Sequence, residues 1–297
     1  MDIERLVLGT AQLGTNYGIA NRMGKPDFDT AEAIVNTAWD AGIREFDTAQ
    51  GYGDSEQVLG EVFQSLGIRN EVKVISKLHP DLNHLSGNEL RESLDNTLIN
   101  LQVPGLYGIM LHREEFLELW NKGLGEKLNK LVKSGLAGKL GVSVYTPQKA
   151  IEALNTEGIF LVQLPSNLLD RRFEKAGVFE LAKKKGKQVY VRSIFLQGLL
   201  LLNSNKMPIK MKFARTVLKT LEDLTQELGL SKQDMAIGYA KHAYPYAKIV
   251  FGVDDPKQIN DNLISWKMSL PSDFVDRIQN TFQFVDEKIL NPALWPS

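Results

Sequence analysis

Short runs of apolar and β-branched residues alternate along the chain with longer stretches in which apolar positions recur every three or four residues. The short runs predict buried strands, and the longer stretches predict amphipathic helices. We expect strands at residues 5–10, 43–48, 72–77, 106–112, 139–144, 160–164, 188–193 and 247–253. We expect helices near residues 30–42, 55–66, 87–101, 122–134, 147–155, 174–185, 211–228, 231–243, 256–268 and 272–285. Asp29 and Thr30 are expected to cap the first of these helices.

The regular alternation of strands and helices predicts an α/β fold built from parallel βαβ units. Several strands are continuous apolar runs, as parallel strands buried on both faces are. A doubly wound sheet and a closed (β/α)8 TIM barrel both fit this order, and the count of eight strands favours the barrel. No Gly-x-Gly-x-x-Gly pattern follows the first strand, which weakens the doubly wound alternative.

The chain carries no obvious domain boundary. No Pro-, Gly- or Ser-rich linker and no abrupt change of composition interrupts its 297 residues. Residues 200–212 form the best candidate for an exposed loop. We therefore expect a single (β/α)8 domain over residues 1–297.

Composition narrows the classes of partner and cofactor. Lys and Arg number 35 against 36 Asp and Glu, so electrostatics give no reason to expect nucleic acid or an anionic membrane. The chain has no cysteine, which excludes disulfides, zinc–thiolate sites and iron–sulfur clusters, and no His or carboxylate spacing predicts another metal site. The first residues do not resemble a secretory signal, and no apolar stretch approaches the ~20 residues of a membrane span. We expect a soluble, cytoplasmic protein; the composition sets no oligomeric state.

Polar side chains close three consecutive predicted strands. Asp47 ends the second strand, Lys77 the third and His112 the fourth, and Tyr52 lies in the loop after the second. In a parallel barrel the carboxyl ends of the strands meet on one face, where catalytic residues are found. We therefore expect these four side chains to lie close together.

The chemistry of the four groups is complementary. A tyrosine hydroxyl is a weak acid, with a reference pKa of about 10, and a nearby ammonium stabilises its anion. A carboxylate would hold the lysine in place, and a neutral imidazole would orient a carbonyl oxygen. Together they predict a site that gives a proton to an oxygen as negative charge develops there. Two alternatives stay open: a Schiff-base aldolase with Lys77 as nucleophile, and a cofactor-binding sensor with little turnover.

Motifs along nearly the whole chain resemble the aldo-keto reductases. They are LGTAQLG at the first strand, REFDTAQGYGDSEQVLG around Asp47 and Tyr52, VISK ending at Lys77, GLYGIMLHR around His112, KLGVSV, FLVQLPSN and FGVDDPKQINDN. The resemblance implies a (β/α)8 barrel that reduces aldehydes or ketones with a nicotinamide cofactor, NAD(P)H, bound without a Rossmann domain. It also implies that Tyr52 is the general acid, that Lys77 and Asp47 tune it, and that His112 orients a small-molecule carbonyl substrate.

The resemblance also implies a set of cofactor contacts. Ser143 and Gln163 fall where the family binds the nicotinamide carboxamide, and Arg192 stands where an aromatic residue often stacks on the ring. The other implied contacts are Ser193, Phe195 and Gln197 in a loop over the pyrophosphate, and Gly252, Asp254, Gln258 and Asn262 after the last strand.

The segment after the last strand predicts a preference for NAD(H). Asp254 and Asp255 occupy a stretch that is basic in NADP(H)-specific members, and Gln258 replaces a phosphate-binding Arg. A 2′-phosphate would be repelled there, whereas a ribose 2′-hydroxyl donates a hydrogen bond to a carboxylate. A purely structural role for the two carboxylates, as caps of the helix near Pro256, stays open.

The loop after the first strand is polar and contains Thr15, Asn16 and Tyr17. Asn16 and Tyr17 are therefore candidate substrate contacts, and a hydroxylated carbonyl compound such as a sugar is preferred to a bulky apolar one. Similarity to a bacterial subset of the family associated with sugar and surface-polysaccharide metabolism points the same way.

Overall fold

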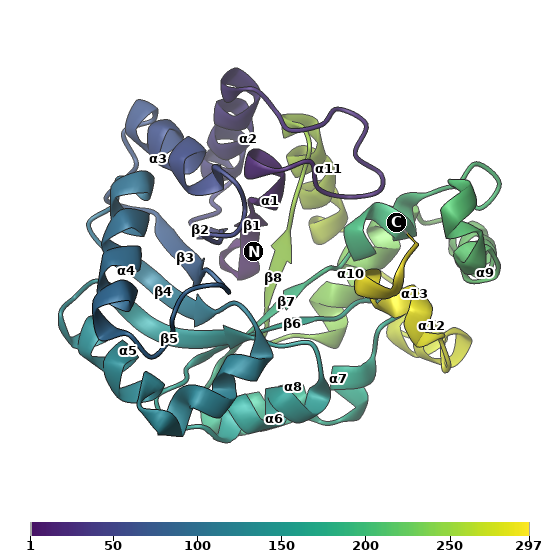
Figure 1. The fold of residues 1–297 in the computed structure, drawn as a ribbon. Helices are drawn as coiled ribbons and strands as arrows, with labels where there is room; N and C mark the ends of the chain where they lie inside the picture. Colours follow the sequence, from purple (N-terminus) through teal and green to yellow (C-terminus); the bar gives the residue numbers. More distant parts are fainter. Residues whose placement is uncertain (1, 297) are drawn as a thin grey trace.

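Eight parallel strands close into a barrel, with β8 pairing back to β1 (Figure 1). The computed structural model describes residues 2–296. The strands are β1 (Leu6–Gly9), β2 (Glu45–Asp47), β3 (Lys73–Leu78), β4 (Leu106–Leu111), β5 (Ala137–Ser143), β6 (Leu161–Pro165), β7 (Gln188–Arg192) and β8 (Lys248–Phe251). Each overlaps the segment in which a strand was expected, and the (β/α)8 barrel is confirmed.

Helices form an outer ring around the strands (Figure 1). The α-helices are α1 (Ala11–Gly14), α2 (Phe28–Asp40), α3 (Ser55–Ser65), α4 (Gly87–Leu101), α5 (Leu124–Lys133), α6 (Pro147–Asn155), α7 (Arg172–Lys175), α8 (Val178–Lys185), α9 (Arg215–Leu228), α10 (Lys232–Ala243), α11 (Pro256–Lys267), α12 (Phe274–Thr281) and α13 (Glu287–Leu290). Short 3₁₀ helices cover Ile3–Arg5, Glu114–Lys122, Leu196–Leu201, Ile209–Ala214 and Pro292–Leu294.

Several helix boundaries differ from the expectation. Asp27, rather than Asp29 or Thr30, caps α2: it has extended backbone angles, and its carboxylate accepts a hydrogen bond from the Thr30 amide at 2.9 Å. The helix expected near 122–134 starts later, because Gly123 adopts a φ of 105°. Gly177, with a φ of 70°, divides the helix expected over 174–185 into α7 and α8.

The segment 200–212 is largely the exposed loop that its sequence suggested, because most of its side chains are exposed, although both of its ends lie in 3₁₀ helices. Leu200 and Met211 are buried, and each lies in a 3₁₀ helix. Between them Ser204 is buried too, and its amide donates a hydrogen bond to Glu222 of α9 at 2.8 Å. The polar composition of the segment reflects these internal hydrogen bonds as well as its surface.

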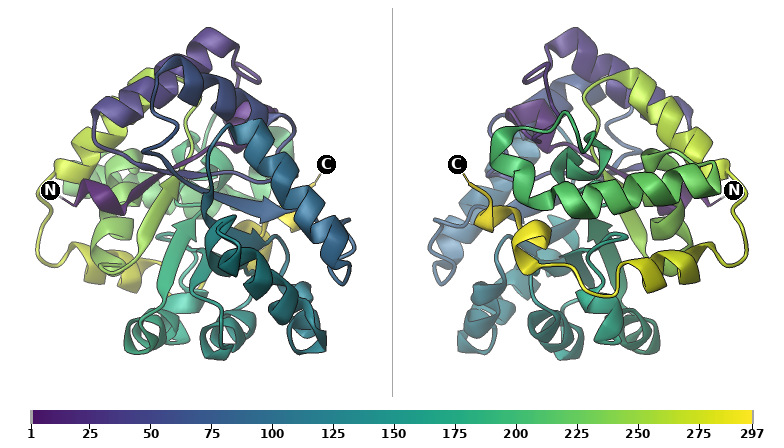
Figure 2. Two further views of the ribbon diagram at one scale, coloured as in Figure 1. Left: turned by 90° about the vertical axis from the view of Figure 1, so that its left-hand side faces the viewer. Right: turned by 90° about the vertical axis from the view of Figure 1, so that its right-hand side faces the viewer.

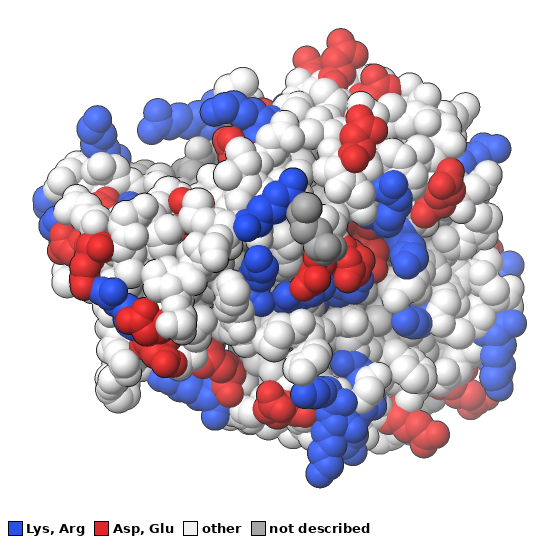
Figure 3. All heavy atoms as spheres, turned by 180° about the vertical axis from the view of Figure 1, so that it is seen from behind, with Lys and Arg blue, Asp and Glu red and all other residues white. Residues whose placement is uncertain are grey.

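The long α9 and the C-terminal helices lie together on one side of the barrel (Figure 2). An ion pair between Arg277 of α12 and Glu227 of α9 joins them. Positive and negative side chains are interspersed on the face opposite to the view of Figure 1 (Figure 3). Within residues 2–296, none of the helices combines the length and the apolar composition needed to cross a lipid bilayer.

The barrel interior has an apolar middle and a polar floor. Its middle is a cluster of side chains from six of the strands, namely Val7, Ile75, Met110, Leu161, Tyr190 and Val250. Toward the amino ends of the strands, Glu45 accepts a hydrogen bond from the Tyr190 hydroxyl at 2.9 Å and pairs with Lys248 at 2.7 Å. The closed floor leaves the opposite end, where the strands terminate, as the place for a site.

Candidate active site

A cleft of about 250 Å³ opens at the carboxyl ends of β1, β2, β7 and β8. Eleven of the residues predicted from the sequence line it, namely Tyr17, Asp47, Tyr52, Arg192, Ser193, Phe195, Gln197, Gly252, Asp254, Gln258 and Asn262. The other five predicted residues, Asn16, Lys77, His112, Ser143 and Gln163, lie outside this lining. The structure therefore gathers side chains from four strands and their loops around one opening.

The Lys77 ammonium contacts two of the other predicted groups, Asp47 and Tyr52. Its Nζ donates to both oxygens of Asp47, at 2.8 and 2.9 Å, and to the Thr48 carbonyl at 3.0 Å. It also donates to the Tyr52 hydroxyl at 3.4 Å. Only 1% of Lys77 is exposed. A buried cation paired in this way holds the phenol beside a fixed positive charge.

The surroundings keep Lys77 charged. Burial by itself lowers the pKa of a lysine, and the Asp47 carboxylate and the Tyr52 hydroxyl together more than offset this, so the pKa of Lys77 is raised. The ammonium therefore persists throughout the neutral pH range.

His112 is held in its neutral form beside Tyr52. The two rings meet edge to face, with centroids 5.7 Å apart. Burial, followed by the charges of Lys77 and Arg192, lowers the pKa of His112 to about 3. A neutral imidazole carries one N–H donor, so it offers a hydrogen bond without adding a positive charge. Its Nδ1 is buried and has no hydrogen-bond partner within residues 2–296.

Gln163 and Ser143 lie in register on β6 and β5, both buried. The Gln163 Nε2 donates to Asp47 Oδ1 at 2.7 Å, and this contact fixes which end of the amide faces the carboxylate. The Gln163 Oε1 is buried and has no hydrogen-bond partner among the residues that the structure describes. An unpaired amide oxygen beside the ion pair fits a ligand that brings N–H donors, as a nicotinamide carboxamide does.

Arg192 ends β7 and faces the cleft. Its guanidinium lies over the Tyr145 ring, 4.6 Å from the centroid, and Nη1 donates to Ser193 Oγ at 3.4 Å. Its Nη2 is buried and has no hydrogen-bond partner in the described part of the chain. Sequence reasoning did not single out Tyr145, although an aromatic residue two positions beyond a strand end was a usable signal.

The loop that follows Arg192 has an unusual backbone. Ser193, Leu196 and Gln197 have φ values of 62°, 49° and 53°, in the left-handed region that few non-glycine residues occupy. The Gln197 carbonyl accepts a hydrogen bond from the Ile19 amide at 2.9 Å, which joins this loop to the one after α1. The two loops thus form one wall of the cleft.

The rim after β8 is acidic and internally bonded. Asp255 caps α11 by accepting from the Gln258 amide at 3.1 Å, and the Gln258 side chain accepts from the Asp254 amide at 2.9 Å. Asp254 lines the cleft, and burial followed by its proximity to Asp255 raises its pKa. The Lys257 side chain is 84% exposed and faces Asp261 at 3.6 Å. The capping role left open for Asp255 is therefore confirmed, while Asp254 faces the ligand space.

The two predicted substrate contacts occupy different positions. Tyr17 lines the cleft, close enough to Tyr52 and Arg192 to interact with them electrostatically. Asn16 lies outside the lining, and its side chain accepts a hydrogen bond from the Lys25 amide at 2.8 Å. Asn16 therefore supports the loop on which Tyr17 lies.

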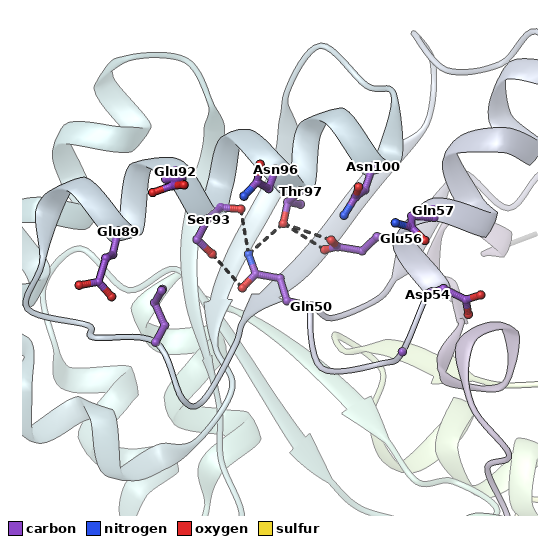
Figure 4. A pocket seen from close by; sticks show the side chains of 12 residues that line it. Gln50, Asp54, Glu56, Gln57, Glu89, Glu92, Ser93, Asn96, Thr97 and Asn100 are labelled. Carbon is purple, nitrogen blue, oxygen red and sulfur yellow. Dashed lines mark hydrogen bonds between the residues drawn. The ribbon is translucent and has the colours of Figure 1, made fainter.

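A second, polar cavity of about 390 Å³ lies behind the loop that carries Tyr52, against α3 and α4 (Figure 4). At its wall the Gln50 amide donates to Thr97 Oγ1 at 2.9 Å and accepts from Ser93 Oγ at 3.0 Å. The same Gln50 oxygen accepts from the His79 amide at 2.6 Å. Gln50, which sequence reasoning missed, thus ties the Tyr52 loop to α4 and to the end of β3.

Glu56 extends this network beneath the loop (Figure 4). Its carboxyl group is buried and accepts from Ser76 Oγ at 2.6 Å and from Thr97 Oγ1 at 3.2 Å. Burial raises the pKa of Glu56, although both hydroxyls oppose the shift. Because Ser76 precedes Lys77 on β3, the network supports the strand and the loop that bring Lys77 and Tyr52 together.

Comparison with known proteins gives a consistent family. The sequence model of the Aldo/keto reductase family matches residues 5–282. Pyridoxal 4-dehydrogenase of Microbacterium luteolum is 26% identical, with 92% of each chain covered. L-glyceraldehyde 3-phosphate reductase of Escherichia coli (strain K12) is 25% identical over 84% of this chain and 80% of that one.

Solved structures share the barrel. The holo form of aldo-keto reductase AKR11C1 from Bacillus halodurans superposes with a TM-score of 0.76 at 22% identity, covering 93% of this chain and 91% of that one. At this identity the likeness concerns the fold. The family match, which spans nearly all of the barrel, establishes that the chain belongs to the aldo/keto reductase family of oxidoreductases, which reduce carbonyl groups with NAD(P)H.

Proposed function

We propose that this chain, acting as one barrel domain, reduces an aldehyde or ketone to the alcohol with Tyr52 as the proton donor. The observation that carries the proposal is the buried Lys77 ammonium, which contacts Asp47 at 2.8 Å and the Tyr52 hydroxyl at 3.4 Å. This arrangement places an acid beside a fixed positive charge, at the face of the barrel where a ligand has access.

The residues divide the work of the reaction. His112, neutral beside Tyr52, donates a hydrogen bond that orients the substrate carbonyl. As hydride adds to the carbonyl carbon, negative charge develops on its oxygen, and the Tyr52 O–H bond breaks to supply the proton. The tyrosinate that remains is stabilised by Lys77, whose position Asp47 fixes.

A reduced nicotinamide cofactor supplies the hydride when bound. Gln163, with its free buried Oε1, and Ser143 would hold the carboxamide. Ser193, Phe195 and Gln197 in the loop after β7, together with Gly252, Asp254, Gln258 and Asn262 after β8, would line the rest of the cofactor.

We further propose that NAD(H) binds more tightly than NADP(H). Arg192 is the one Lys or Arg among the described residues that line the cleft, and Asp254 faces the ligand space after β8. A ribose hydroxyl donates to such a carboxylate, whereas a 2′-phosphate is repelled by it.

Fluorescence titration of both reduced cofactors tests this preference. We expect the wild type to bind NADH more tightly than NADPH. Asp254→Asn should reduce the difference between the two dissociation constants, because NADPH binds more tightly once the carboxylate is removed. Asp255→Asn is the matched control, because it removes the same charge while an asparagine still caps α11. Tighter binding of NADPH by the wild type would contradict the preference.

A hydroxylated, sugar-like carbonyl compound is the proposed substrate class. Tyr17 and the Gln12 amide supply hydrogen-bonding groups to the cleft. The relative named L-glyceraldehyde 3-phosphate reductase supports a small hydroxylated aldehyde. Oxidation of reduced cofactor across a panel of sugars, aliphatic aldehydes and steroid ketones tests the class, and a tenfold or greater advantage in kcat/KM for the apolar compounds would refute it.

Two alternatives predict other outcomes. A Schiff-base aldolase needs a neutral lysine amine, which the raised pKa of Lys77 opposes. Borohydride trapping of a substrate on Lys77 without cofactor would favour it. A cofactor-binding sensor would bind nicotinamide tightly without oxidising it in the presence of any carbonyl in the panel.

A further inference from the structure

Arg192 has more hydrogen-bonding capacity than the protein uses. A guanidinium carries five N–H donors. The one hydrogen bond of the Arg192 side chain, to Ser193 Oγ, is long at 3.4 Å, and Nη2 is buried without a partner. Within residues 2–296, no carboxylate forms an ion pair with it. A partly buried cation left unpaired costs free energy, so the arrangement suits a ligand that brings the missing negative charge.

The guanidinium is also held in a definite orientation. One face lies on the Tyr145 ring, with 4.6 Å between the guanidinium carbon and the ring centroid. Stacking leaves the edge of the fork available for hydrogen bonds in the plane of the group. The side chain lines the same cleft as Tyr17 and Tyr52.

The positive charge acts on the carbonyl site itself. Arg192 is one of the charges that, after burial, lower the pKa of His112, and it interacts electrostatically with Tyr17. An anion bound to Arg192 would therefore lie within reach of the position that Tyr52 and His112 define.

We infer that the substrate carries an anionic group, a carboxylate or a phosphate, which pairs with the Arg192 fork while its carbonyl lies at Tyr52 and His112. This rests on the proposed carbonyl reduction and narrows its substrate class. Both oxyanions match the spacing of the guanidinium donors. The phosphates of the cofactor present the same chemistry, so the experiment must separate cofactor from substrate.

The test compares neutral and anionic aldehydes of equal carbon length. The pairs are butanal with succinate semialdehyde, and glyceraldehyde with glyceraldehyde 3-phosphate. We expect the wild type to favour the anionic member of at least one pair by about tenfold or more in kcat/KM. Arg192→Met should remove that preference, mainly through a raised KM for the anionic member, so that kcat/KM falls about tenfold further for the anionic member than for the neutral one. Arg192→Lys keeps the charge without the fork and should retain part of the preference.

Arg113→Met is the matched control. Arg113 also contributes to the electrostatic environment of His112, but its side chain is 53% exposed and faces Glu115. It should leave the anion preference unchanged. Titration of NADH and NADPH with each variant gives the cofactor affinities, and so separates a contribution of Arg192 to cofactor binding from one to substrate binding.

Three results would overturn the inference. The first is equal kcat/KM for both members of each pair in the wild type, which decides the matter even if Arg192→Met does not fold. The second is a fall in the kcat/KM of Arg192→Met that is equally large for the neutral and the anionic aldehydes. The third is a selective loss of NADPH or NADH affinity in Arg192→Met, which would assign the guanidinium to the cofactor. Failure of the wild type to oxidise reduced cofactor with any carbonyl would instead refute the proposed function.

Discussion

At the scale of single residues, the site depends on how completely each polar atom is used. The Lys77 ammonium donates hydrogen bonds to Asp47, Thr48 and Tyr52, so its position is fixed. The Gln163 amide, in contrast, uses one end and leaves the other free. Satisfied groups define the geometry, and unsatisfied ones indicate where a ligand would bind.

The protonation of His112 is the first prediction. Because its pKa is lowered to about 3, the imidazole should stay neutral as the pH falls from 8 to about 4. Heteronuclear NMR of labelled imidazole rings measures this directly, with free histidine, whose pKa is about 6.5, as reference. A His112 signal that titrates with the reference would show that the ring is charged at mildly acidic pH, and the neutral donor role would have to be abandoned.

The sequence was sufficient to predict the candidate catalytic residues, but not all of the residues that hold them in position. Asp47, Lys77 and His112 were identifiable because strand ends in a barrel share one face. The contacts of Gln50 and Tyr145 could not be identified from the sequence, because they depend on loop conformations and on the elements that each loop contacts. The orientation of the Gln163 amide likewise follows from its contact with Asp47, a residue more than a hundred positions away.

At the scale of elements, α1 and the loop carrying Tyr52 pack through glycine. A Cβ atom on Gly14 would lie 1.8 Å from the Tyr52 carbonyl oxygen, and one on Gly53 would lie 2.3 Å from the Gly14 carbonyl oxygen. Gly53 also has a φ of 57°. Only residues without a side chain allow this approach, and it determines where Tyr52 lies relative to β1.

Gly14→Ala should therefore displace the Tyr52 loop. We expect a loss of about 1–3 kcal/mol in the free energy of unfolding, together with a fall in kcat, because the added methyl group meets backbone atoms that have no free space to move into. Gly87→Ala is the control, since the nearest atom to its added Cβ is the Lys127 side chain at 3.9 Å. Denaturant unfolding and steady-state kinetics of both variants measure the effects. Equal behaviour of the two variants would show that the close approach is unimportant.

Elements were predictable to different degrees for a physical reason. Strands and long helices repeat a burial pattern that is visible in sequence, so all eight strands were found. Helix starts depend on one capping contact, and Asp27 was missed in favour of its neighbours. The exposed loop at 200–212 was predictable, but its short 3₁₀ helices leave too few periodic positions to show that Leu200 and Met211 are buried.

At the scale of the whole molecule, the barrel separates stability from chemistry. The polar floor of Glu45, Tyr190 and Lys248 closes the amino ends of the strands, and the cleft with Tyr52 opens at the other end. The apolar interior between them isolates one end from the other. Changes at the floor should therefore affect folding far more than turnover.

Tyr190→Phe tests this separation. Removing the hydroxyl leaves Glu45 paired with Lys248 but takes away one buried hydrogen bond, so the free energy of unfolding should fall by about 1–2 kcal/mol. The kcat and the cofactor affinity should stay within about twofold of wild type. Thermal or urea unfolding beside steady-state kinetics provides both numbers. A drop in kcat without a loss of stability would mean that the floor and the cleft are coupled.

The measurement that tests the central claim most directly is the single-turnover rate of carbonyl reduction by Tyr52→Phe, with cofactor prebound. The substitution removes the hydroxyl that Lys77 contacts at 3.4 Å and keeps the ring beside His112. We predict a fall of about 10²–10⁴-fold in the rate of reduction, the usual contribution of general acid catalysis, with a cofactor dissociation constant within about threefold of wild type. A Tyr52→Phe rate within about threefold of wild type would contradict the assignment of Tyr52 as the proton donor.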